Sequence, residues 1–231
     1  MIIQMYVEYQ NIKLGCPNLA SINEFLTVER PSESVLTIKK SKFICNVKPV
    51  SSLEEVEEFI GAVRKKYWDA THNVYAYCVG IGNEEIQKSS DDGEPSGTAG
   101  RPALEVIRSK QLKNVAVVIS RYFGGILLGA SGLIRAYSQS AKFGLENSGV
   151  IKMMRANEYS ITVDYSTINR LESTLRNNKF LIGDINYGEM AEMHVYVPVN
   201  EVGRFEKCIS ELGIKLGGIN FLKTCFVKTK P

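Results

Sequence analysis

A single turn carries three carboxylates within four residues, Asp91, Asp92 and Glu94. Clustered carboxylates move protons in acid/base catalysis and hold hard cations such as magnesium, so this cluster is a candidate chemical site. Aspartate, glycine and proline also build tight polar turns, and Pro95 follows directly, so an ordinary loop explains the same residues. His72 is the residue type of a general base, but the sequence places no nucleophile beside it. We therefore assign no catalytic residue and no metal ligand.

A glycine-rich segment lies between an apolar strand and a helix, as a phosphate-binding loop does. Gly124 and Gly129 have the G-x-x-x-x-G spacing of such a loop. Ala130 and Ser131 stand where its lysine and its serine or threonine should follow, which argues against a nucleotide hydrolase. Backbone N–H groups at the helix start could still hold one phosphate or carboxylate. Close packing of the helix on the strand explains the glycines equally well.

The acidic turn and the glycine segment together define one alternative function, an enzyme or small-molecule binder with a pocket formed by both. Such a pocket would take a phosphate-bearing small ligand at the helix start, and the sequence indicates no cofactor for it. The alternative requires the two segments to meet in space. Its candidate residues are His72, Asp91, Asp92, Glu94, Thr98, Gly124, Gly125 and Ser131.

Positive charge is concentrated in residues 101–142, which hold seven lysines and arginines against one acid, whereas the whole chain has a net charge of +3. A concentration of cations with an aromatic residue nearby is typical of phosphate contact combined with base stacking. A solvated helix face explains Arg135 and Lys142 nearly as well. The candidate nucleic-acid contacts are Arg101, Arg121, Tyr122, Arg135 and Lys142.

The composition is that of a globular protein with room for two cores, at 231 residues with 44% hydrophobic and 23% charged residues. No apolar run is long enough to span a membrane, and the N-terminus lacks the pattern of a signal peptide. The five cysteines include no C-x-x-C pair, so the sequence contains neither a disulfide framework nor a four-thiolate zinc site. We expect a cytoplasmic protein without a membrane partner.

Periodicity predicts an N-terminal domain over residues 27–149, after an extension at 1–26 that shows no clean pattern. Ser52 and Glu55 have the spacing of a capping box. Five consecutive apolar residues at 115–119 predict a strand that is covered on both faces. The expected elements are two strands around the turn at 39–42, a helix over 52–67, strands at 73–79 and from Ile86, a helix at 102–109, the strand at 115–119 and a helix from about Ser131.

The rest of the chain predicts a linker at 150–157 and a second domain at 158–231. This domain has the order strand, helix, strand, strand, helix, strand, which is the ferredoxin-like arrangement. Its nine acidic and nine basic residues cancel, so it is the weaker candidate for contact with a polyanion. The expected fold class is α+β with two domains.

The segments DDGEPSGTAGRPALEVI and ISRYFGGILLGASGLIRAYSQSA, together with KKSKFI at 39–44 and HNVYAY at 72–77, resemble the signature of the IMPACT/YigZ family over roughly residues 26–231. The resemblance implies an N-terminal α/β sandwich similar to domain IV of elongation factor G and to a ribosomal-protein domain. It also implies a C-terminal ferredoxin-like domain similar to the last domain of that factor. The matching motif residues are Asp91, Asp92, Gly93, Glu94, Pro95, Gly97, Thr98, Ala99 and Gly100, then Arg121, Tyr122, Gly124, Gly125, Gly129, Gly132, Leu133 and Ala136.

The eukaryotic members of the family resemble translation regulators that bind the activator of an initiation-factor kinase through an additional N-terminal domain. Residues 1–26 are too short for that domain, so we do not transfer the partner. The leading hypothesis is a cytosolic, non-enzymatic protein that binds RNA or the ribosome and acts in translation or its stress regulation. The pocket described above is the alternative, and the sequence leaves the oligomeric state open.

Overall fold

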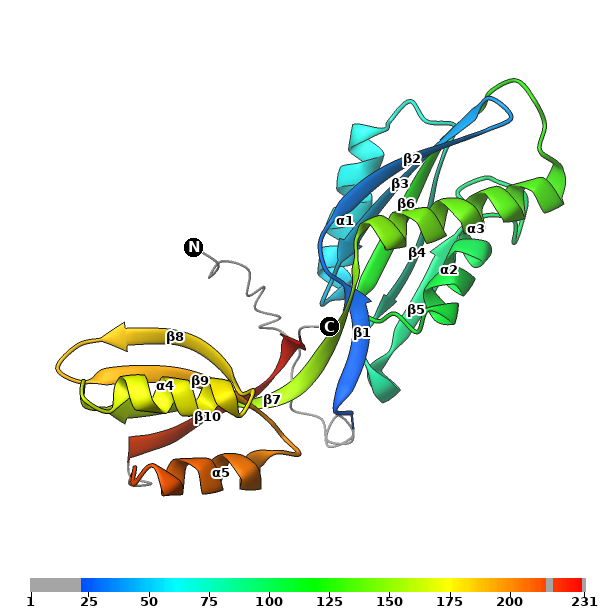
Figure 1. Cartoon of the computed structure of the whole chain (residues 1–231). Coiled ribbons are helices and arrows are strands. Elements are labelled where there is room, and N and C mark those ends of the chain that lie inside the picture. The colour runs from blue at the N-terminus through cyan, green and yellow to red at the C-terminus, as the bar shows by residue number, and fades with distance from the viewer. Residues whose placement is uncertain (1–21, 215–217, 230–231) are drawn as a thin grey trace. The chain divides into compact units, whose positions relative to one another are not determined.

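The computed structural model describes residues 22–214 and 218–229, and these residues form two units that divide within one strand between Met153 and Met154. The fold is α+β with two domains, as expected from the sequence (Figure 1). The predicted extension at 1–26 lies largely outside the described residues, but its end contributes to strand β1, Glu24–Val28. None of the helices in the described ranges is long and apolar enough to cross a membrane.

The N-terminal unit is a five-stranded antiparallel sheet with helices on both faces. In order across the sheet its strands are β2 (Ser32–Ile38), β3 (Ser41–Pro49), β6 (Val115–Tyr122), β4 (His72–Val79) and β5 (Ile86–Ser90). Its helices are α1 (Leu53–Lys66), α2 (Gly100–Ser109) and α3 (Gly129–Asn147), and a short 3-10 turn spans Gly82–Glu84.

Strand β6 lies at the centre of the sheet because both of its faces are apolar. Val117 and Ile119 pack in the large core that α2 and α3 cover, whereas Ala116 packs in the smaller core under α1. Successive side chains of a strand point to opposite faces, so a continuous apolar run requires a cover on each face. The predicted strand with two covered faces is confirmed.

Two predicted local features of this unit are also confirmed. Strands β2 and β3 form a hairpin through Lys39 and Lys40, whose φ angles of 44° and 67° are those of a tight two-residue turn. At the start of α1, Ser52 Oγ accepts a hydrogen bond from the N–H of Glu55 at 3.3 Å.

Helix α3 presents Leu133, Tyr137 and Leu145 to the core, as the sequence spacing indicates. Ile134 was also predicted to be buried, and this prediction is wrong because its side chain is 42% exposed. It follows Leu133 by about 100° around the helix, which places it at the edge facing α2 rather than under the helix.

The second unit has the predicted strand, helix, strand, strand, helix, strand order. Its elements are β7 (Val150–Val163), whose residues before Met154 belong to the N-terminal unit, α4 (Ile168–Asn177), β8 (Leu181–Tyr187), β9 (Ala191–Pro198), α5 (Val202–Glu211) and β10 (Ile219–Thr229). Strand β1 pairs with β7. The expected linker at 150–157 is not a separate connection, because these residues are the first part of β7. Alternating residues of β9, such as Met193 and Val195, face a core shared with Leu171 and Phe205 of the two helices.

Candidate functional site

The acidic turn is organised by Asp91, whose carboxylate accepts three backbone hydrogen bonds. Its oxygens bind the N–H groups of Gly97 at 2.8 Å, Ala99 at 3.0 Å and Gly100 at 2.8 Å. Gly100 begins α2, and Ala99 before it offers no side-chain cap, so Asp91 satisfies N–H groups that the helix cannot. The Asp91 carboxylate therefore stabilises the conformation of this loop.

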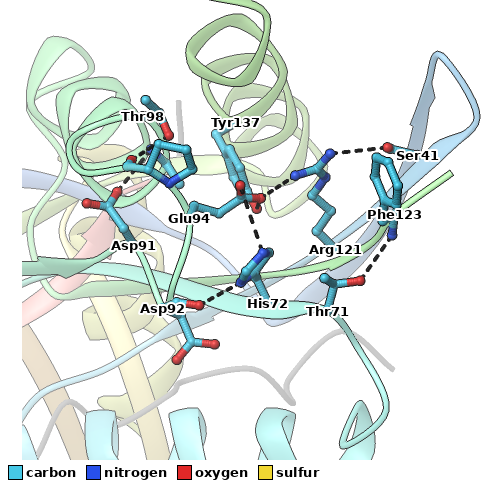
Figure 2. A network of polar contacts seen from close by, with 12 residues as sticks. Ser41, Thr71, His72, Asp91, Asp92, Glu94, Thr98, Arg121, Phe123 and Tyr137 are labelled. Atoms are coloured by element: carbon cyan, nitrogen blue, oxygen red, sulfur yellow. Dashed lines mark hydrogen bonds and ion pairs between the residues drawn. The ribbon is translucent and has the colours of Figure 1, made fainter. Parts of the chain in front are cut away.

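Asp92 fixes the turn to its surroundings. Its Oδ1 accepts from Arg64 of α1 and its Oδ2 from the N–H of Asn73, both at 2.7 Å. Its backbone carbonyl lies 2.7 Å from His72 Nδ1 (Figure 2). A carbonyl oxygen only accepts, so Nδ1 carries a proton and the neutral ring has an unprotonated Nε2.

Glu94 points into the domain and forms a buried ion pair with Arg121. Arg121 Nη1 lies 2.6 Å from Glu94 Oε1, and the two side chains are only 7% and 3% exposed. The Tyr137 hydroxyl donates to the same oxygen at 2.7 Å (Figure 2). Burial, and then the hydrogen bond to Glu94, raise the pKa of Tyr137 far above its usual value, so this hydroxyl is a donor at any ordinary pH.

Arg121 is held by the strand register and by aromatic rings. It stands opposite His72 on β4 and opposite Phe43 on β3. Its guanidinium carbon lies 5.6 Å from the ring centres of both Phe43 and Phe123. Nη2 donates to Ser41 Oγ at 3.4 Å, whereas the buried Nε has no hydrogen-bond partner within the described part of the chain.

A pocket of about 390 Å³ adjoins this cluster and joins the two motifs. His72 Nε2 and Glu94 Oε2 face each other there across 4.0 Å (Figure 2). The small-ligand hypothesis required the acidic turn and the glycine segment to meet, and they do. The lining residues are Thr71, His72, Glu94, Pro95, Arg121, Phe123, Leu127, Leu128, Gly129, Ala130 and Leu133.

Of the eight predicted pocket residues, only His72 and Glu94 line this pocket. Thr98 donates to the carbonyl of Pro95 at 2.6 Å and so closes the turn. Gly124 is structural, because a Cβ there would lie 2.0 Å from the Lys40 carbonyl carbon and its N–H already donates to Ser41 Oγ. The others that lie outside the lining are Asp91, Asp92, Gly125 and Ser131.

The five predicted nucleic-acid contacts do not lie together on one surface. Arg121 was predicted to contact phosphate, but it is buried and paired with Glu94, so it is not on a surface that a polyanion can reach. Arg135 and Lys142 line a second hollow, which we call the α2–α3 groove. Arg101 and Tyr122 lie outside its lining. Nucleic-acid contact by the four accessible residues stays a prediction.

Sequence reasoning missed three contributors to these two sites. Tyr137 and Phe123 complete the pocket cluster, and Lys110 lines the α2–α3 groove. A tyrosine in the core stripe of a helix was a usable signal, because a buried hydroxyl needs a hydrogen-bond partner. No local pattern predicts that Lys110, directly after α2, meets Lys142 of α3.

The sequence matches two family descriptions, the Impact N-terminal domain over residues 39–145 and a domain of unknown function (DUF1949) over residues 161–213. The chain is 42% identical over 207 residues to IMPACT family member YvyE of Bacillus subtilis, covering 87% of this chain and 95% of that protein. This chain belongs to the IMPACT family. IMPACT family member YigZ of Escherichia coli is 29% identical over 191 residues, covering 82% of this chain and 94% of that protein.

Similarity to a more distant relative is confined to part of the chain. Protein IMPACT of Rattus norvegicus is 38% identical over 98 residues, which are 41% of this chain and 30% of that protein. A solved structure described as a hypothetical protein is 28% identical, with a TM-score of 0.57, and covers 87% of this chain and 97% of its own. The family expected from the motifs is thereby confirmed.

Proposed function

We propose that this protein binds RNA through the α2–α3 groove. The groove has a volume of about 580 Å³ and is lined by Lys110, the residue directly after α2, together with Arg135 and Lys142 of α3. Ser109, Ser138 and Gln139 add hydrogen-bonding groups, and Val106 and Ile134 add apolar surface. Cations that neutralise phosphates supply most of the sequence-independent affinity for nucleic acid.

The two cations of α3 are the observation that carries this proposal. Arg135 and Lys142 are seven residues apart, so they lie on the same side of the helix and about 10 Å apart along its axis. Neither forms an ion pair within the described residues, whereas Lys110 contacts Glu146 at 3.3 Å. Unpaired cations in one groove are available to successive phosphates.

The family and its fold supply the biological setting. The resemblance of the two domains to elongation factor domains favours ribosomal RNA as the partner and translation or its stress regulation as the process. The same fold can carry different functions, so the experiment tests the charges of the groove itself.

The proposal is tested by fluorescence anisotropy with labelled single-stranded RNA and by co-sedimentation with ribosomes. We expect the Arg135→Glu/Lys142→Glu variant to bind RNA at least about ten-fold more weakly, because two phosphate contacts are lost and repulsion replaces them. Both side chains lie in the groove on a helix surface, so the variant should fold, which circular dichroism checks.

The matched control is Lys65→Glu/Lys207→Glu, which makes the same change in net charge at two exposed positions outside the groove. We expect this control to retain most of the affinity for RNA. Equal losses of RNA affinity in the two variants would show that the overall net charge, and not the groove, determines binding. Undiminished binding by Arg135→Glu/Lys142→Glu would overturn the proposal for this surface.

A further inference from the structure

The pocket beside Glu94 presents two hydrogen-bond acceptors and is not used by the proposed RNA contact. Glu94 Oε2 and His72 Nε2 both line it, 4.0 Å apart, and Nε2 is an acceptor when the ring is neutral, because Nδ1 then carries the proton. The other oxygen of Glu94 already accepts from Arg121 and Tyr137. With the ring neutral, two acceptors face each other across this distance, and one donor group between them satisfies both. A primary amine has enough N–H groups to bind both.

The start of α3 adds hydrogen-bond donors to the lining of the pocket. Gly129 and Ala130, the first residues of α3, line it. Leu128 precedes them and provides no side-chain cap. The first N–H groups of a helix have no partner inside the helix, and the helix dipole favours an anionic oxygen there.

The charge of the lining limits the ligand. Glu94 and Arg121 cancel, and the ring of His72 is neutral when Nε2 is unprotonated. A ligand of zero net charge therefore matches the pocket better than a phosphate, whose charge would find no unpaired cation in the lining. The buried Arg121 Nε has no hydrogen-bond partner among the residues that the structure describes, so the hydrogen bonding of this cluster is incomplete there.

Much of the remaining lining is apolar, and it includes Pro95, Phe123, Leu127 and Leu133. The side chains of Phe123 and Leu127 are 47% and 83% exposed. The volume of about 390 Å³ is that of a small-ligand site. We infer that the pocket binds an apolar α-amino acid group, either free or as the first residue of a peptide. Its amine lies at Glu94 and His72, its carboxylate or carbonyl oxygen at the start of α3, and its side chain against Phe123 and Leu127.

The test is isothermal titration calorimetry of the full chain with L-leucine, the peptide Leu-Gly-Gly, N-acetyl-L-leucine and inorganic phosphate. We expect L-leucine or Leu-Gly-Gly to bind, and the stronger of the two identifies the natural source of the group. N-acetyl-L-leucine should bind at least about ten-fold more weakly, because acetylation removes the positive charge and leaves one N–H, which cannot serve both Glu94 and His72.

Two substitutions at Ala130 test whether the start of α3 contributes to the site. They leave the core unchanged, because Ala130 is exposed. Ala130→Asp places a carboxylate in the first turn of α3, where it stabilises the helix but repels a bound carboxylate. We expect it to weaken binding of L-leucine about ten-fold, whereas the neutral Ala130→Asn should change binding little.

Binding of N-acetyl-L-leucine as tight as that of L-leucine, preference for phosphate, or no binding of any amine ligand would overturn the inference. Equal effects of Ala130→Asp and Ala130→Asn would remove the helix start from the site. The Arg135→Glu/Lys142→Glu variant should bind the amino acid normally, so failure of the RNA proposal and failure of this one are distinguishable.

Discussion

Glu94 and Arg121 meet inside the N-terminal unit although 27 residues separate them in the chain. The pair occupies a position that an apolar pair could fill, since Phe43, Phe123 and Leu133 surround it or line the pocket beside it. Burying two charges costs about as much as their attraction returns, so such a pair seldom exists for stability alone. The buried pair is therefore better explained by a binding role than by stability alone.

Removing one member of the pair should be much worse than removing both. We expect Arg121→Met to lower the free energy of unfolding by about 3–5 kcal/mol, because Glu94 is left buried and uncompensated. Urea denaturation followed by circular dichroism measures the loss.

The double variant Glu94→Gln/Arg121→Met is the control, since it leaves no buried charge at this position. It should be more stable than Arg121→Met alone. A double variant that is no more stable than Arg121→Met alone would contradict the expected cost of leaving Glu94 buried and unpaired.

Tyr122 gives a prediction about pH. A hydrogen bond from its hydroxyl to Asp69, at 2.7 Å, raises its pKa to about 12. The stabilisation is fully present below the unfolded-state value of about 10 and is lost as the pH rises through about 12. The tyrosinate absorbance that wild type shows and Tyr122→Phe lacks should therefore appear near pH 12. Its appearance near pH 10 would contradict the assigned hydrogen bond.

At the residue scale, the sequence predicted that the acidic turn and the glycine segment meet, but not the role of each residue there. The three carboxylates of the turn have the same chemistry in the sequence, but the turn conformation gives each of them different partners. Asp91 and Asp92 bind backbone N–H groups, and Glu94 alone reaches the buried Arg121. These assignments depend on the register of β4, β6 and the loop, which the types and spacing of the residues do not determine.

Helix α3 packs so closely on β3 that one of its glycines has no room for a side chain. A Cβ at Gly144 would lie 2.4 Å from Cys45 Sγ and 3.1 Å from a methyl group of Val47. Alanine normally favours a helix over glycine by about 1 kcal/mol, but overpacking a core costs about 1–3 kcal/mol. We expect Gly144→Ala to lower the free energy of unfolding by about 1–2 kcal/mol, measured by urea denaturation.

Cys45→Ala makes room for the added methyl group and provides the control. The double variant Gly144→Ala/Cys45→Ala should be more stable than Gly144→Ala alone. An increase in stability for Gly144→Ala by itself would show that helix propensity outweighs the close approach and that α3 can move away from β3.

At the element scale, long periodic segments were predictable and boundaries were not. The capping box of α1 and the apolar run of β6 each set one element from local residues. Helix α3 begins at Gly129, two residues before the predicted start, because glycine tolerates the φ of +69° at its entry. The stretch predicted as a linker continues as β7, since pairing with other strands, which local composition does not reveal, holds it extended.

At the scale of the whole molecule, the two units differ in net charge. The positive excess of the chain lies within residues 101–142, whereas the acidic and basic residues from Glu158 onward cancel. Family membership and the presence of two domains were predictable because the motifs are long and ungapped. The α2–α3 groove was not, since its cations come from α3 and the end of α2, which only tertiary packing brings together.

The affinity of the α2–α3 groove for RNA should depend on salt concentration. Three phosphate contacts from Lys110, Arg135 and Lys142 should give log K for single-stranded RNA a slope of about −2 against log salt concentration. In the Arg135→Glu/Lys142→Glu variant, the magnitude of this slope should fall below about 1. Anisotropy titrations at several salt concentrations measure both slopes. An unchanged slope would mean that the phosphates contact other residues.

Amide hydrogen exchange of the full chain, with and without single-stranded RNA, tests the central claim most directly because it observes both units in one experiment. RNA in the α2–α3 groove should slow exchange in residues 106–110 and 134–142 and leave residues 158–214 unchanged. Protection that is confined to the C-terminal unit, or that is absent at saturating RNA, would contradict the proposed function.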